Sequence, residues 1–168
     1  MFWFNNKKEN CNLTINNIES QVIYAPIKGK RLELETVEDK VFSEKLLGDG
    51  VAVEPEDNKL YSPVSGIISV VFPTRHVIGI KAENGADLII HVGIDTVELK
   101  GEGFITKVKE GDRVKAGELL MEIDLKLIKK NYKATTMIVI ENFTEYTLEH
   151  NLTENILAGN ELMRIQRE

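Results

Sequence analysis

The sequence is poor in the residues that several classes of protein require. Cys11 is the only cysteine among 168 residues, which excludes an intramolecular disulfide and a thiolate-rich metal site. Apolar runs such as Met137-Ile138-Val139-Ile140 are far shorter than the ~20 residues that span a bilayer. The chain also starts without the apolar segment of a secretory signal, so we expect a cytoplasmic protein.

Basic charge is scarce as well. Lys and Arg number 21 against 27 Asp and Glu, a formal net charge of −6, which argues against a nucleic-acid partner.

Hydrophobic residues make up 42% of the chain, enough for one domain with a core, which we assign to residues 20–168. Residues 1–19 are polar and rich in Asn, and they are predicted to form a flexible tail. The apolar start Met1-Phe2-Trp3-Phe4 allows at most weak contact with a membrane.

Short β-type runs separated by turn signals fill the domain. Only residues 124–132 have helical character, with Asp124 as the expected N-cap. Many short strands with one short helix predict an all-β fold, an antiparallel sandwich or barrel with one or two short helical turns. The expected strands are residues 21–24, 31–34, 50–54, 66–72, 77–81, 87–92, 104–108, 118–123, 136–140 and 161–166.

An internal repeat indicates how the domain is built. Residues 24–29 (YAPIKG) and 61–66 (YSPVSG) share the pattern Tyr-small-Pro-aliphatic-x-Gly, and each leads into an expected strand. Two copies are too few for a solenoid, which needs at least three stacked units. We therefore expect a sandwich of two related halves.

Two histidines bracket a predicted hairpin. Asn84-Gly85 lies between His76 and His91, and Asn-Gly is the strongest short hairpin signal. If these two residues form the loop, His91 lies opposite Ile78 and both histidines share one face of the ribbon. Diagonal neighbours on such a face lie ~7–8 Å apart at the backbone, so the two imidazoles are expected to meet.

Two facing imidazoles allow more than one chemistry. They can ligate a metal, act as acid and base, or let one ring serve as a nucleophile that the other supports. Two unrelated histidines on a half-buried sheet are the structural alternative. His150 lies in a polar segment and is expected to be an ordinary surface residue.

The residues around His91 also resemble a known signature. Residues 85–97 (GADLIIHVGIDTV) and 98–104 (ELKGEGF) are similar to the phosphohistidine motif of glucose-family enzyme IIA, from the phosphoenolpyruvate-dependent sugar phosphotransferase system. Residues 41–45 (VFSEK) and 48–52 (GDGVA) continue the resemblance, which runs from about residue 22 to residue 164.

The resemblance implies a function and a site. His91 would accept a phosphoryl group from the phosphocarrier protein HPr and pass it to a cysteine on the IIB domain of a sugar permease. His76 would steady the phosphoryl group, and Thr74 would orient His76. No cofactor is required, but the two histidines could hold zinc at an interface if a partner supplied another ligand.

The resemblance further implies a docking surface around the histidines, and it leaves open whether the protein also has regulatory targets. Within this surface, Phe42 is expected to be exposed, together with Val41, because a short apolar pair in a polar segment offers no continuous face to bury. The residues that match the family's docking surface are Val41, Phe42, Val51, Phe72 and Ile89, with Asp39 and Asp95 at the rim.

Two other classes share part of these features. A lysostaphin-type zinc peptidase has a metal motif that residues 91–95 resemble, but the His-x-His pair that completes its site is absent from the sequence. A biotinyl or lipoyl carrier module resembles residues 110–120, but the facing segment with Asp39-Lys40 lacks the symmetric hairpin tip of such a carrier. Both classes stand as alternatives to a phosphoryl carrier.

Overall fold

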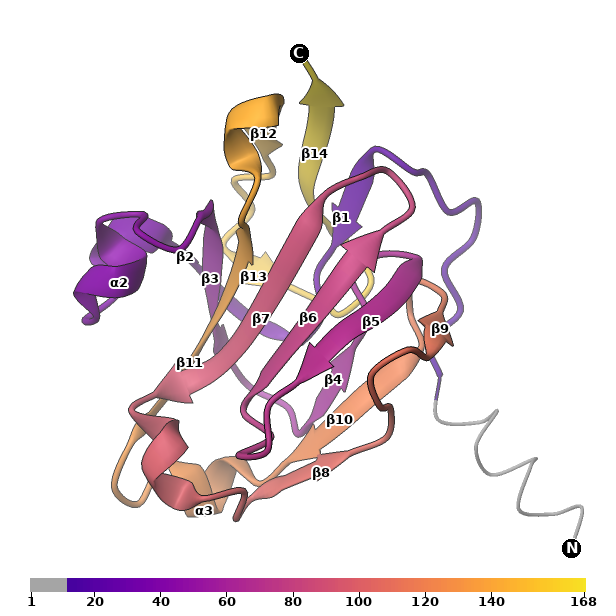
Figure 1. The fold of residues 1–168 in the computed structure, drawn as a ribbon. Helices are drawn as coiled ribbons and strands as arrows, with labels where there is room; N and C mark the ends of the chain where they lie inside the picture. Colours follow the sequence, from indigo (N-terminus) through magenta and orange to yellow (C-terminus); the bar gives the residue numbers. More distant parts are fainter. Residues whose placement is uncertain (1–11) are drawn as a thin grey trace, which may run out of the picture.

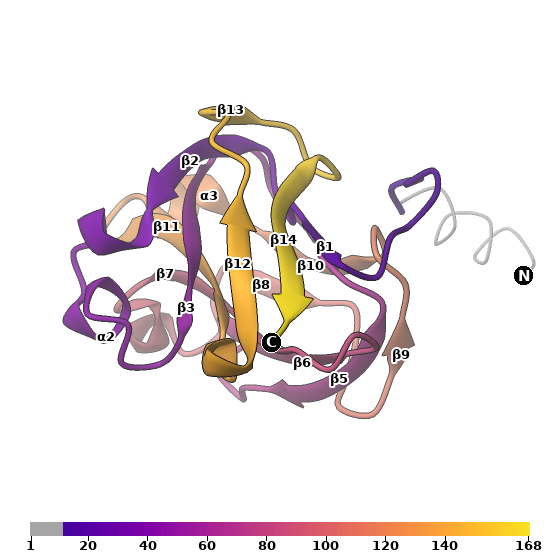
Figure 2. The same ribbon diagram turned by 90° about the horizontal axis from the view of Figure 1, so that it is seen from above.

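Antiparallel strands dominate the computed structural model, which describes residues 12–168 (Figures 1 and 2). The larger sheet has the order β13 (Asn155–Ile156), β2 (Gly29–Glu33), β3 (Asp49–Pro55), β11 (Lys133–Ile140), β7 (Asp87–Ile94), β6 (Val77–Ala82), β5 (Gly66–Val71) and β9 (Arg113–Val114). One smaller sheet joins β1 (Val22–Tyr24), β14 (Glu161–Arg167) and β12 (Tyr146–His150); the other joins β4 (Lys59–Tyr61), β10 (Leu119–Ile123) and β8 (Phe104–Thr106). In Figure 1 these two smaller sheets lie toward the top and the bottom of the view. The predicted antiparallel all-β fold is confirmed.

The two halves of the domain are related, as the repeat predicts. Tyr24 N donates to the Pro63 carbonyl at 2.9 Å, and Tyr61 N donates to the Pro26 carbonyl at 2.8 Å, so the two motifs bind each other reciprocally. The strand orders repeat too: β13-β2-β3-β11 corresponds to β9-β5-β6-β7, and β1-β14-β12 corresponds to β4-β10-β8. The glycine that ends each motif lies where a side chain would overlap a carbonyl of the neighbouring strand.

Apolar residues form clusters on both faces of the larger sheet. The main cluster fills the space between the sheets and includes Val51, Val53, Ile78 and Ile90. A second cluster covers the opposite face of the same central strands because alternate residues point to opposite sides. Its buried members are Leu34, Val37, Phe42, Ala52, Val77, Ile89, Met137 and Val139.

The helical segments are short, and Asp side chains cap two of them. Helix α3 (Leu125–Ile128) begins as predicted, where the Asp124 carboxylate accepts from Leu127 N at 3.1 Å, although it ends four residues earlier than expected. Helix α2 (Lys40–Ser43) is capped by Asp39 and lies beside β2 and β3 in both views (Figures 1 and 2). Four residues are too few for apolar periodicity to reveal this helix. The 3-10 turns are η1 (Leu34–Thr36), η2 (Thr96–Leu99) and η3 (Phe143–Glu145).

The predicted tail falls into two parts. Residues 1–11, which include the apolar start and the cysteine, lie outside the described residues. Residues 12–19 contact the domain: Leu13 N donates to the Gly117 carbonyl at 2.8 Å, and the Asn12 side chain accepts from Leu119 N at 2.9 Å. Within residues 12–168, no helix is long and apolar enough to cross a membrane.

Candidate functional site

The hairpin that carries the histidines has a different register from the predicted one. His91 lies opposite Val77 rather than Ile78. Ala82 N donates to the Ala86 carbonyl at 2.9 Å, so the loop contains three residues, 83–85, and not two. Gly85 alone in this loop has a left-handed φ, of 94°, and the Asn84 side chain accepts from Ala86 N at 2.9 Å. The Asn-Gly pair therefore forms a longer turn with a left-handed glycine, in place of a type I′ turn.

The two imidazoles nevertheless meet. The ring centroids of His76 and His91 lie 4.9 Å apart, and the ring planes are perpendicular, at 90°. Strict alternation along the observed ladder would place the two side chains on opposite faces. His76 escapes this alternation because it precedes the first residue of β6 and follows Arg75, whose φ of 64° is left-handed. Thr74 Oγ1 lies 3.0 Å from His76 Nδ1, within hydrogen-bond distance.

His91 is surrounded by apolar side chains on the second face of the larger sheet. Val77 and Met137 are its partners on the two neighbouring strands, and both are buried. The Phe42 ring lies 4.9 Å from the imidazole of His91 at an interplanar angle of 63°. On the other side of the pair, the Phe72 ring lies 5.9 Å from that of His76.

A tight turn directly after His91 fixes the end of β7. Gly93 has a φ of 86°, and a Cβ at this position would overlap the Thr96 side chain and lie 3.0 Å from the Lys133 carbonyl. The Thr96 hydroxyl donates to the Val92 carbonyl, so the turn is closed by a buried side chain. Position 93 requires glycine, because its φ is left-handed and the Thr96 side chain leaves no room for a Cβ.

Burial favours the neutral form of both imidazoles. It is the main reason that the pKa of His91 falls from 6.5 to about 4, and charge on His76 contributes to this decrease. The Gly93 carbonyl and the Asp39 carboxylate act on this pKa in the opposite direction. Burial also lowers the pKa of His76, opposed by the backbone of Thr74. Nδ1 of His91 is buried, which leaves Nε2 as the ring nitrogen that a partner can reach.

The structure corrects part of the predicted docking surface. Phe42 was predicted to be exposed, but its side chain is buried and only 3% exposed. Helix α2 turns the ring into the second cluster and against His91. Val51 is fully buried in the main cluster, on the face of β3 that points away from His91. Ile89 lies on the His91 face but is also buried. These three side chains cannot form an open docking surface in this conformation.

Other predicted surface residues remain accessible. Val41 and Phe72 are 45% and 41% exposed. Asp39 caps α2 and is half-buried, and Asp95 is exposed at the start of η2. Val97 was not predicted for this surface, yet it is 46% exposed within the turn that follows His91. Its signal in the sequence is an apolar residue between polar neighbours.

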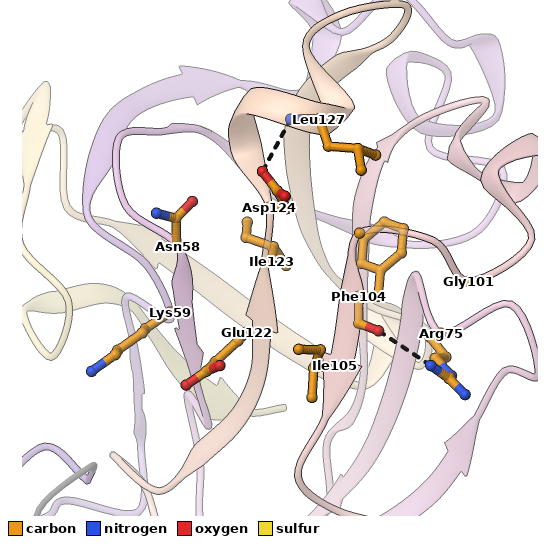
Figure 3. A pocket seen from close by; sticks show the side chains of 11 residues that line it. Asn58, Lys59, Arg75, Gly101, Phe104, Ile105, Glu122, Ile123, Asp124 and Leu127 are labelled. Carbon is orange, nitrogen blue, oxygen red and sulfur yellow. Dashed lines mark hydrogen bonds between the residues drawn. The ribbon is translucent and has the colours of Figure 1, made fainter.

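A pocket of ≈660 Å³ lies between β8, β10 and α3 (Figure 3). Arg75 and Phe104 line it, and the Phe104 ring lies 6.4 Å from that of His76. Other parts of the wall come from β8, β4, β10 and α3, with Lys59, Glu122 and Leu127 among their side chains. The histidines do not line this pocket and lie next to it.

His150 is not an ordinary surface residue, contrary to the prediction. Its Nδ1 lies 3.1 Å from an Nη of Arg31, which is buried. A guanidinium only donates hydrogen bonds, so Nδ1 accepts and the ring is neutral. Burial and the charge on Arg31 lower the pKa of His150, whereas Asp49, Glu33 and Glu35 act to raise it.

The donor set for a metal is incomplete. Among residues 12–168, no group of three or more His, Cys, Asp or Glu side chains is arranged to hold a metal ion. His76 and His91 supply two imidazoles, whereas a zinc site normally uses three or four protein ligands. A metal at this pair would therefore depend on a ligand from another protein.

A neutral imidazole beside a second imidazole is one arrangement that can carry out nucleophilic group transfer. The sequence model of the family described as "phosphoenolpyruvate-dependent sugar phosphotransferase system, EIIA 1" matches residues 21–146. The chain belongs to this family and is a phosphotransferase component and phosphoryl carrier of such a system.

Individual relatives agree with this assignment. The chain is 44% identical over 128 residues to the "PTS system glucose-specific EIIA component" of Halalkalibacterium halodurans, covering 76% of this chain and 74% of the relative. It is 46% identical over 129 residues to the "PTS system glucose-specific EIICBA component" of Staphylococcus carnosus, covering 76% of this chain and 19% of that protein. The solved structure of glucose permease IIA from Mycoplasma capricolum matches with a TM-score of 0.81 and 37% identity, covering 86% of this chain and 94% of the other. These matches do not favour a zinc peptidase or a biotinyl or lipoyl carrier.

Proposed function

We propose that His91 accepts a phosphoryl group from phospho-HPr and passes it to a cysteine on the IIB domain of a sugar permease. The observation that carries this proposal is the contact between His91, held neutral by burial, and the second imidazole of His76. A neutral imidazole offers one nitrogen lone pair as a nucleophile. Because Nδ1 is buried, we assign this role to Nε2.

The two transfers balance without a cofactor. In the first, the Nε2 lone pair forms a bond to phosphorus while the bond between phosphorus and HPr breaks. In the second, the cysteine thiolate of the IIB domain forms the new bond and His91 leaves as a neutral imidazole. Such transfers depend on positioning and on stabilisation of charge on the phosphoryl oxygens.

His76 supplies part of that stabilisation. Its Nδ1 is engaged by Thr74, so its Nε2 can donate a hydrogen bond to a phosphoryl oxygen on His91. If Thr74 Oγ1 donates to Nδ1, the neutral ring carries its proton on Nε2, the nitrogen that this role requires.

The partners follow from the family and its fused members. Relatives from Staphylococcus carnosus are named as EIICBA components, glucose-specific in one case and glucoside-specific in another. We infer that this chain is located in the cytoplasm and that it serves a permease for glucose or a glucoside. Val41, Phe72 and Val97 would contact HPr and the IIB domain, with Asp39 and Asp95 at the rim.

Two further parts of the hypothesis concern metals and regulation. No cofactor is needed for either transfer, and zinc would bind at His76 and His91 only with a third ligand from a partner. Regulatory targets would use the same exposed surface, since it already has to accommodate two different partners.

The test is reconstitution with phosphoenolpyruvate, enzyme I and HPr, followed by mapping of acid-labile phosphate. We expect phosphate on His91 in the wild type and none on a His91→Ala variant. His76→Gln should still accept phosphate on His91 but deliver it more slowly to the IIB cysteine. Acid-labile phosphate that persists on His91→Ala would contradict the assignment of the nucleophile, and unchanged delivery by His76→Gln would remove His76 from the mechanism.

A further inference from the structure

The strand alone does not explain the position of His76. His91 lies opposite Val77, so in an ideal ladder residues 76 and 91 would point to opposite faces. The rings meet because His76 is the last residue of the loop that joins β5 to β6. The conformation of this loop therefore decides on which side of the sheet the His76 imidazole lies.

The loop reverses direction in two steps. Arg75 N donates to the Phe72 carbonyl at 2.8 Å and closes a turn that has Pro73 as its second residue, where the fixed φ of proline is favoured. Arg75 itself has a φ of 64°, in the left-handed region that most side chains avoid. The His76 carbonyl then accepts from Val92 N at 2.8 Å, so the chain rejoins the sheet directly after Arg75.

We propose that Arg75 is a positioning residue for phosphoryl transfer, because its left-handed backbone turns His76 toward His91. This inference rests on the proposed function and adds a residue to it. Arg75 acts through His76 and not on the phosphoryl group. A residue that cannot adopt the left-handed conformation would turn His76 away while leaving His91 and its surroundings in place.

The Arg75 side chain makes a second and weaker contribution. Nη1 donates to the Phe104 carbonyl at 3.4 Å, which is long for a hydrogen bond (Figure 3). The stem of Arg75 covers Gly101, where a Cβ would lie 3.6 Å from Arg75 Cδ. These contacts hold the loop against the start of β8 and the segment before it, but they do not set the direction of His76.

A matched pair of substitutions separates the backbone from the side chain. Arg75→Asn and Arg75→Val both remove the guanidinium, but Asn tolerates the left-handed region and β-branched Val does not. Three quantities are measured on each variant: the rate of acceptance from phospho-HPr, the rate of donation to the IIB domain, and the NMR titration of both histidine rings. Thermal melting shows that each variant is folded.

We expect Arg75→Asn to keep the wild-type donation rate and ring signals. Arg75→Val should accept phosphate from phospho-HPr normally but donate it about tenfold more slowly, because a β-branched residue avoids the left-handed region more strongly than Arg and would leave His76 beside His91 in only a small fraction of molecules. The pKa of His91 should also rise in this variant, because the charge on His76 no longer acts on it. If Arg75→Val is unfolded, Arg75→Thr takes its place, since Thr is also β-branched and avoids the left-handed region more strongly than Arg.

The outcomes distinguish this proposal from the proposed function. Wild-type donation and unchanged ring signals in Arg75→Val would overturn the role of Arg75. An Arg75→Asn variant as impaired as Arg75→Val would also overturn it, because the guanidinium and not the backbone would then be the cause. Failure of the wild type to accept phosphate would contradict the proposed function instead, and the NMR comparison would still test Arg75.

Discussion

Replacing Phe42 tests whether this ring belongs to the core or to an open docking surface. Phe42 is 3% exposed and lies 4.9 Å from the ring of His91. A Phe→Ala change in such a site leaves a cavity and costs about 3–5 kcal/mol. For a chain of this size, 1 kcal/mol corresponds to roughly 2–4 °C in Tm. We therefore expect Phe42→Ala to lower the Tm by roughly 6–20 °C.

The same substitution should change the chemistry of His91. Burial is the largest cause of the low pKa of His91, about 4, and the Phe42 ring contributes to that burial. Solvent that enters the cavity should raise the pKa of His91 toward 6.5, its ordinary value. The assay is thermal melting at pH 7 combined with an NMR titration of the imidazole.

Val41→Ala is the matched control, because Val41 adjoins Phe42 in the chain but is 45% exposed. It should leave the Tm within about 2 °C of the wild type, as surface substitutions usually do, and weaken only the binding of HPr. A Phe42→Ala variant that melts like the wild type and loses HPr affinity would refute the burial described here. Phe42 would then be an exposed docking residue.

Three further predictions follow from the turn after His91 and from the histidines. Gly93→Ala should destabilise the protein by about 2 kcal/mol or more in urea unfolding, because the left-handed φ and the contact with Thr96 exclude a side chain. The free energy of unfolding should fall as the pH drops from 6.5 to about 4, because the unfolded chain binds a proton at His91 that the folded chain does not. In His91→Gln, which lacks this titrating group, the decrease should be smaller. His150→Gln, which keeps an acceptor for Arg31, should be more stable at pH 7 than His150→Leu, and an equal Tm for the two variants would refute the role of that contact.

The features that the sequence predicts correctly depend on residues that are close together in the chain. Alternating apolar residues locate the strands, since a sheet with one solvated face repeats every two residues. The Tyr-Pro-Gly repeat indicates two halves, and Asp124 marks the start of α3 because an N-cap acts on its own helix. The histidine pair is also visible in the sequence, since the two residues flank a single hairpin.

Other features depend on contacts that are distant in sequence. Asn84-Gly85 signals a hairpin, but the dipeptide does not fix the loop length, and one extra loop residue changes the register. The burial of Phe42 depends on a second apolar cluster that covers the outer face of the sheet. Val51 lies on a strand buried on both faces, where a period of two does not reveal which face a residue occupies.

The duplicated fold provides two equivalent positions for a histidine pair, and only one of them carries it. Gly29 pairs with Pro55 as Gly66 pairs with Ala82, so β3 corresponds to β6 residue by residue. This correspondence places Asp49 at the position of His76, and Val139, which pairs with Gly50, at the position of His91. Val139 is fully buried within the second cluster and has no nucleophilic atom. The backbone alone therefore does not create the site, since the same geometry serves packing in one half and chemistry in the other.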